Sequence, residues 1–99
     1  MTRQEILEEI MDRDLFQKDE YIILADGFED AFLGVTATKP IKVVYDYWKC
    51  LDLIIKRDNA GFDEAMDWLE EFIEEELGQH APLYIKQIQW KVFTTYKKL

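Results

Sequence analysis

The sequence predicts an α+β domain in which a small antiparallel sheet of about three strands packs on a helical hairpin and an N-terminal helix. In 42–77, apolar residues recur at steps of three and four on both sides of a turn at 58–61, as in two amphipathic helices. Two short β-rich runs, 21–25 and 31–36, lie on either side of an Asp-Gly turn. A chain of 99 residues that is 48% hydrophobic can bury one core, so we expect a single domain over 1–99.

The first expected element is a helix over 3–15. Thr2 can cap this helix, and Glu5 completes a capping box. Ile6 and Ile10 then begin an apolar stripe, while acids cover the other face. A polar break follows, and we expect the chain to continue into strands.

The next expected elements are strands at Tyr21–Ala25 and Ala31–Thr36, with a turn at Asp26–Asp30 between them. Both runs have the length and the residue types of strands, and Asp26-Gly27 is a strong turn pair. The stretch 21–36 therefore predicts a β-hairpin, or one long bulged strand and its return.

The helical hairpin follows a loop that ends at Pro40. Proline disfavours helix at the residue before it, so the first helix should begin after Pro40, with a brief extended stretch at 41–44 left open. The two predicted stripes are Val44, Trp48, Leu51 and Ile55, and then Phe62, Met66, Leu69 and Ile73. Trp48 and Trp68 lie within these faces and are expected in the core, and Cys50 is expected to be a buried, inert thiol.

Gly78 falls where a left-handed helix cap belongs, and His80 follows as a capping or surface histidine. Leu83–Ile85 reads as a strand, and we favour a strand over 83–93 because Val, Phe and Thr favour that state. Residues 86–99 form a basic C-terminal tail whose spacing also fits a helix.

The net charge of −9 is unevenly distributed. Residues 83–99 contain four lysines and no acid, so they carry +4, and residues 1–82 carry −13. This charge argues against binding to nucleic acid or to an anionic membrane surface. No apolar segment approaches the roughly 18–20 residues needed to span a bilayer, and the charged N-terminus does not resemble a signal peptide. With a single cysteine, these features indicate a cytoplasmic protein.

The second helix of the hairpin is strongly acidic, with eight acids and no base in residues 63–76. Like charges at i,i+4, such as Glu70 with Glu74 and Glu71 with Glu75, repel each other. These four glutamates are our first candidate surface for a partner with a basic surface. Two other interpretations stay open: an ordinary solvated face, and pairing with the basic tail of this chain or of a second copy in a homodimer.

The loop Asp26–Asp30 is the second candidate. Its carboxylates, Asp26, Glu29 and Asp30, could contact a partner, or could serve a small-ligand or metal-dependent enzyme. Their spacing does not match a calcium loop, and a solvated turn in which Asp26 accepts from backbone amides is the simpler interpretation. We therefore assign no catalytic residue, no metal ligand and no cofactor.

Several short segments follow one another in a defined order along the chain. They are Ala25-Asp26-Gly27-Phe28-Glu29-Asp30-Ala31-Phe32-Leu33-Gly34-Val35, Val44-Tyr45-Asp46, Lys49-Cys50, Lys56-Arg57-Asp58, Ala65, Gly78 and Pro82-Leu83. The set resembles small uncharacterised proteins of tailed bacteriophages, which share a DGF-x-x-A-x-x-G strand motif, a V-Y-D helix start and a G-x-x-T-P-I ending. This chain differs in its more acidic Glu70–Glu76 and in Ala81.

The resemblance implies a phage accessory protein that acts in the bacterial host cytoplasm, and it implies no catalytic residue. Together with the acidic helix, it predicts a non-enzymatic protein that binds a host or phage macromolecule. An inhibitor acting through that helix would be one form of this role. The alternatives are the enzyme at the Asp26–Asp30 loop and a structural protein that forms homo-oligomers.

Overall fold

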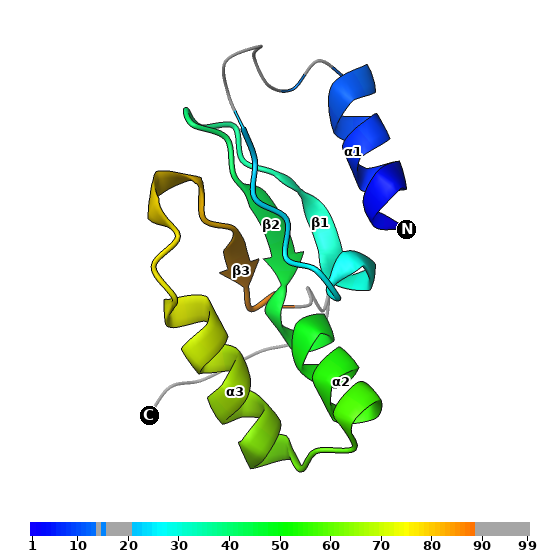
Figure 1. Ribbon diagram of the computed structural model, residues 1–99, viewed down its shortest axis with the longest axis vertical. Coiled ribbons are helices and arrows are strands. Elements are labelled where there is room, and N and C mark those ends of the chain that lie inside the picture. Colours follow the sequence, from blue (N-terminus) through cyan, green and yellow to red (C-terminus); the bar gives the residue numbers. More distant parts are fainter. Residues whose placement is uncertain (14, 16–20, 89–99) are drawn as a thin grey trace, which may run out of the picture.

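The computed structural model describes residues 1–13, 15 and 21–88 of the chain (Figure 1). In chain order its elements are α1 (Arg3–Asp12), the 3₁₀ turn η1 (Glu29–Ala31), β1 (Phe32–Val35), β2 (Val43–Asp46), α2 (Tyr47–Asp58), α3 (Phe62–Glu74), the 3₁₀ turn η2 (Gly78–His80) and β3 (Leu83–Ile85). Helices and a three-stranded sheet within these residues confirm the predicted α+β class. No helix in this part of the chain has the length and apolarity required to cross a membrane.

The sheet has the order β1-β2-β3. It was predicted to be antiparallel, but it is mixed. β1 and β2 form an antiparallel hairpin, whereas β3 runs parallel to β2 with Tyr45 opposite Tyr84. The reason is visible in Figure 1: α2 leads away from the end of β2, α3 returns, and the chain then turns back into β3 in the direction of β2. A connection through two helices allows the parallel pairing.

The predicted strand at Tyr21–Ala25 is wrong as an element of the sheet. This segment is extended, but β1 pairs with β2 instead. Its Ala25 amide donates a hydrogen bond of 2.9 Å to the Tyr45 hydroxyl. The segment therefore contributes side chains to the core without adding a strand, and the predicted 21–36 hairpin is replaced by the β1–β2 hairpin.

The first hairpin helix begins at Tyr47 rather than directly after Pro40, and the extended stretch left open at 41–44 is in part a strand. Val43–Asp46 is strand β2, because its β-branched and aromatic residues pack between β1 and β3. Asp46 then caps α2 by accepting a hydrogen bond of 3.0 Å from the Trp48 amide. At the other end, Asn59 closes the helix in the left-handed conformation, so the predicted turn at 58–61 is confirmed.

Helix α1 has the predicted capping box. The Thr2 hydroxyl accepts from the Glu5 amide at 3.1 Å, and the Glu5 carboxylate accepts from the Thr2 amide at 3.0 Å. The helix ends at Asp12, short of the predicted residue 15. Its buried residues are Ile6 and Ile10, as the stripe indicated.

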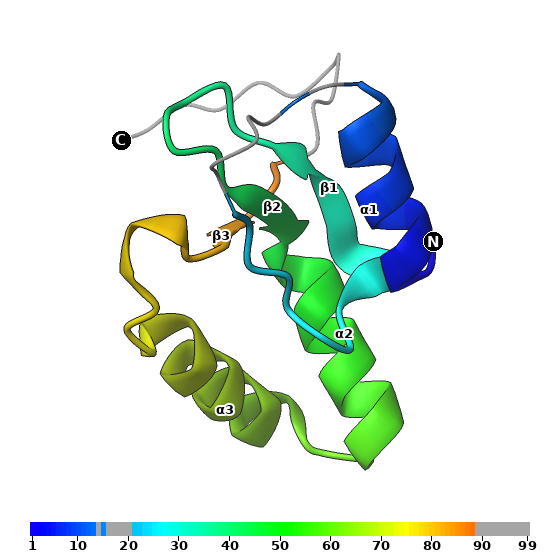
Figure 2. The same ribbon diagram turned by 45° about the horizontal axis from the view of Figure 1, so that its top comes forward.

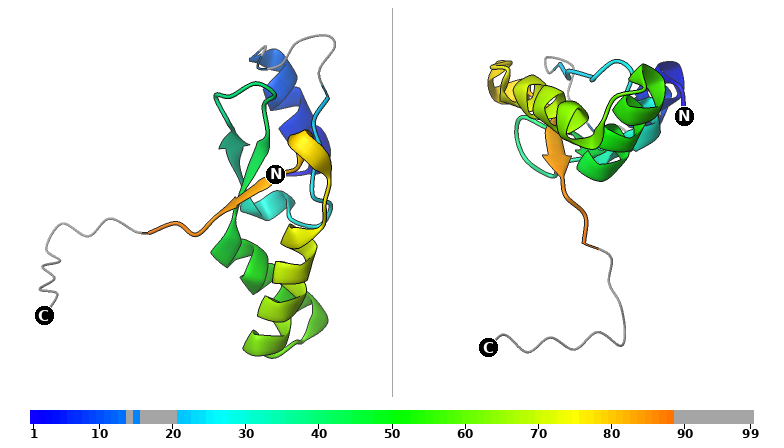
Figure 3. Two further views of the ribbon diagram at one scale, coloured as in Figure 1. Left: turned by 90° about the vertical axis from the view of Figure 1, so that its left-hand side faces the viewer. Right: turned by 90° about the horizontal axis from the view of Figure 1, so that it is seen from below.

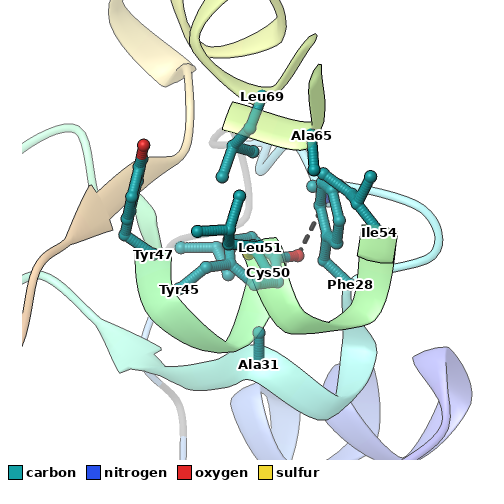
Figure 4. Packing of buried hydrophobic residues seen from close by; sticks show 11 residues of the cluster. Phe28, Ala31, Tyr45, Tyr47, Cys50, Leu51, Ile54, Ala65 and Leu69 are labelled. Carbon is teal, nitrogen blue, oxygen red and sulfur yellow. Dashed lines mark hydrogen bonds between the residues drawn. The ribbon is translucent and has the colours of Figure 1, made fainter. Parts of the chain in front are cut away.

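The three helices lie on different sides of the sheet. In Figures 1 and 2, α1 runs beside β1, whereas α3 lies on the side of β3, with α2 continuing from β2. The side and end views in Figure 3 show α2 and α3 next to each other beyond the end of the sheet. The main core cluster forms where the sheet meets this helix pair, and Figure 4 shows Tyr45, Cys50 and Leu69 within it.

Three predictions of burial need correction. Trp48 and Trp68, expected in the core, are 45% and 47% exposed. Both helices turn smaller residues inward, including Cys50 and Ala65, because the space between them and the sheet is already filled by Phe28 and Tyr45. His80, expected at the surface, is buried.

Candidate functional site

The acidic helix α3 has two distinct faces. Ala65 and Leu69 are fully buried against the core, and Ile73 is partly buried beside them. The opposite face is exposed and contains Asp63, Glu64, Asp67, Glu70, Glu71 and Glu74. The helix ends at Glu74, three residues before the predicted end, so the exposed Glu75 is its C-cap residue.

The candidate glutamates, Glu70, Glu71, Glu74 and Glu75, make no ion pair within 1–13, 15 and 21–88. The pairs between these residues use other carboxylates: Asp30 with the Met1 amino group, Arg3 with Asp26, Arg13 with Glu9, Lys49 and Lys56 with Asp52, and Arg57 with Asp58. The negative potential along α3 is therefore not cancelled by direct contacts in the described part of the chain.

Exposed aromatic side chains accompany the acids on α3. Phe62 is 54% exposed, and Trp68 stacks on Phe72 with ring centroids 5.4 Å apart and an interplanar angle of 12°. Aromatic residues at a surface provide most of the binding energy in many protein interfaces. The acids of α3 and these exposed aromatic side chains together form a surface that could bind a basic protein through both charge and apolar contact.

The second candidate, the loop Asp26–Asp30, is used within the fold. Asp26 pairs with Arg3 at 3.1 Å, and Asp30 lies 3.7 Å from the Met1 amino group. The Glu29 carboxylate accepts from the Gly27 amide at 3.1 and 3.2 Å. The three carboxylates thus hold the loop to itself and to the start of α1, and no group of metal-binding residues converges in the described ranges.

The predicted turn is confirmed, although Glu29 rather than Asp26 accepts the backbone hydrogen bonds. The structure does not bring Asp26, Glu29 and Asp30 together with the glutamates of α3 into one contact network. The loop therefore offers a weaker candidate surface than α3.

A recess lies between α3 and the chain around β3. It has a volume of about 220 Å³ and is lined by Tyr47, Glu70, Ile73, Glu74, Tyr84 and Lys86. We call it the Tyr47 recess. Two of the four predicted glutamates thus line a concave site, whereas Glu71 and Glu75 lie outside it.

The floor of the Tyr47 recess contains an unusual hydroxyl. Tyr47 is only 3% exposed, yet its hydroxyl has no hydrogen-bond partner among the described residues. Figure 4 shows this ring directed away from the cluster around Cys50, with the oxygen at its far end. Burial, and then the negative charge of Glu70, raises the pKa of Tyr47 above its usual range. A buried hydroxyl without a partner costs about 1–3 kcal/mol.

A cation lies on the aromatic wall of the recess. The Lys86 ammonium is 4.7 Å from the centre of the Tyr47 ring and 5.8 Å from that of Trp48. The Trp48 indole N–H donates to the Gln87 carbonyl at 3.2 Å, which holds this part of the chain beside α2. Tyr47, Tyr84 and Lys86 were not predicted as site residues. They come from α2 and from the chain around β3, and no spacing in the sequence relates these two segments.

A larger cavity of about 470 Å³ lies between α1 and β1. Apolar residues dominate its lining, including Ile10, Phe32 and Val35. The charged residues there, Glu9 and Arg13, pair with each other at 2.9 Å. Since this pair already satisfies both charges, the cavity offers less polar recognition than the Tyr47 recess.

Cys50 and His80 do not form a reactive pair. Cys50 is fully buried, so the predicted burial of this thiol is confirmed, and burial raises its pKa from 9.0 to about 12. The ring of His80 instead packs on Tyr21, with centroids 3.8 Å apart, and its Nδ1 has no partner within the described residues.

The sequence matches no protein-family model, and neither the curated proteins nor the solved structures include a significant match to it.

Proposed function

We propose that this protein is a non-enzymatic binding protein whose acidic α3 face holds a basic surface of another macromolecule. The observation behind this proposal is the row of exposed glutamates, Glu70, Glu71 and Glu74, which have no ion-pair partner in the described part of the chain. A basic protein surface would neutralise them and relieve their mutual repulsion.

The composition of the helix supports a protein partner. Trp68 and Phe62 supply exposed aromatic area next to the acids, and aromatic side chains are enriched in protein interfaces. A partner recognised by charge alone would not need this apolar area. The net charge of −9 works against nucleic acid as the partner.

The biological setting is part of the same proposal. The resemblance of the segments around Asp26–Val35 and Val44–Asp46 to bacteriophage proteins supports an accessory role in the cytoplasm of an infected bacterium. In that role, the α3 face would bind a host or phage protein, with inhibition of the partner as one outcome.

The test compares two variants that each remove three charges from one helix. The first is Glu70→Gln with Glu71→Gln and Glu74→Gln on α3, and the control is Glu8→Gln with Glu9→Gln and Asp12→Asn on α1. The immobilised full chain is exposed to a lysate of phage-infected bacteria, and captured proteins are eluted with increasing salt. We expect the α3 variant to release its partner at lower salt, and the α1 variant to behave as the wild type.

The captured protein should present a basic surface, and its complex with this chain should weaken steeply with ionic strength. Equal capture by the wild type and the α3 variant at every salt concentration would show that α3 is not the binding surface. Circular dichroism of both variants verifies that the fold is intact.

A further inference from the structure

We infer that the Tyr47 recess is a binding site for the guanidinium group of an arginine side chain on the basic partner. This inference rests on the proposed function, since it names the side chain that the α3 surface selects. It is carried by three features of the recess: paired carboxylates, an unpartnered hydroxyl and an aromatic wall that already accepts a cation.

The carboxylates define the charge of the ligand. Glu70 and Glu74 are one helical turn apart, so both side chains project over the same side of α3. Like charges in this arrangement favour a cation between them. Because both are exposed and unpaired among the described residues, the cation can come from a partner.

The Tyr47 hydroxyl indicates which kind of cation the recess prefers. This buried oxygen has no partner within the described residues, its residue lines the recess, and the negative charge of Glu70 acts on it. A guanidinium carries five N–H donors in one plane and can therefore donate to more than one of these acceptors at once. A lysine ammonium is a compact charge with three donors and cannot span the same set as well.

The size and the wall of the recess agree with a single side chain. Its volume of about 220 Å³ is below the roughly 300–1,000 Å³ of pockets that bind small molecules. The Tyr47 ring in this wall attracts cations, as the position of the Lys86 ammonium 4.7 Å from its centre shows, and Trp48, which does not line the recess, lies 5.8 Å from the same ammonium. Lys86 acts as an internal substitute that an arginine displaces.

The test uses the full chain and two short labelled peptides of glycine, serine and lysine, which differ only in a central arginine or lysine. Binding is measured by fluorescence anisotropy. We expect the arginine peptide to bind about five- to tenfold more tightly, the effect of one added hydrogen bond of ordinary net strength.

The matched variants separate the recess from the surface around it. Glu70→Gln with Glu74→Gln should abolish the preference for arginine, whereas Glu71→Gln with Glu75→Gln, which removes the same charge outside the recess, should weaken both peptides equally. Tyr47→Phe keeps the ring and should reduce the preference. Lys86→Met should tighten binding of the arginine peptide.

The outcomes also separate this inference from the proposed function. If both peptides bind equally and both glutamate pairs matter equally, the α3 surface stands and the recess is refuted. If no glutamate variant changes the binding of either peptide, both are refuted. A preference for arginine that survives Tyr47→Phe, or weaker binding after Lys86→Met, would also overturn the recess as described.

Discussion

The Ala25 amide donates a hydrogen bond of 2.9 Å to the buried hydroxyl of Tyr45, and this contact ties the extended segment 21–25 to the central strand β2. The bond links residues that are twenty positions apart in the chain. It explains how a segment with the composition of a strand can belong to the core without joining the sheet. The hydroxyl of Tyr47, also buried, lacks such a partner in the described residues.

Removing each of these two hydroxyls should have different effects on stability. Tyr45→Phe leaves the buried Ala25 amide without its acceptor, so we expect a loss of about 1–3 kcal/mol in the free energy of unfolding. Tyr47→Phe removes an oxygen without a described partner and should leave stability unchanged or increase it. Urea denaturation of both variants measures the difference. Equal destabilisation would contradict the assigned hydrogen bond.

The start of α2 should depend on the side chain of Asp46. Asp46→Ala removes the acceptor for the Trp48 amide, and we expect it to cost about 1 kcal/mol. Asp46→Ser supplies another capping oxygen and is the matched control, expected to retain most of the stability. Thermal unfolding monitored by circular dichroism compares the two. A serine variant as unstable as the alanine variant would argue against the capping role.

Stability should fall in alkaline solution. Burial raises the pKa of Cys50 from 9.0 to about 12 and that of Tyr45 from 10.0 to about 12. Above pH 9 the unfolded chain therefore loses protons that the folded chain retains, so unfolding becomes more favourable as pH rises towards 12. Each group contributes up to about 1.4 kcal/mol per pH unit in the interval between its two pKa values.

Urea midpoints measured from pH 7 to pH 11 test this prediction. Cys50→Ala should make the decline with pH shallower between pH 9 and 10, where Cys50 contributes more than either Tyr45 or Tyr84, although it lowers stability at every pH by leaving a small cavity. A slope at pH 9–10 that is identical in this variant and in the wild type would show that Cys50 ionises in the folded protein. The protection of the thiol can be followed separately by its slow reaction with a thiol reagent.

Adjacent residues of α3 should separate binding from folding. Leu69 is fully buried, and Leu69→Ala should lower the free energy of unfolding by about 2–5 kcal/mol. Trp68 is 47% exposed, so Trp68→Ala should have a much smaller effect on stability while weakening capture of the partner. Denaturation and the salt-elution assay measure the two quantities. Normal capture by the Trp68 variant would exclude this side chain from the interface.

Local signals in the sequence predicted much of the fold. The capping box at Thr2 and Glu5, and the turn between α2 and α3, are correct because they depend on residues close together in the chain. The position of α2 was predicted less well, since Val43–Asp46 joins a strand on each side and tertiary pairing outweighed the helical pattern. The strand predicted over 83–93 is confirmed only at Leu83–Ile85, since 86–88 do not continue it and the part beyond Ile88 lies outside the described ranges.

The sequence by itself determined the charge of this protein, the amphipathic faces of its helices and the acids on α3, because these follow from composition and spacing. Tertiary structure alone decided that β3 lies parallel to β2, that Trp48 and Trp68 stay exposed, and that Tyr47, Glu70 and Lys86 border one recess. The physical reason is that α2, α3 and β3 meet only when the core forms. Contacts between residues so far apart depend on how the elements pack, and no local pattern encodes them.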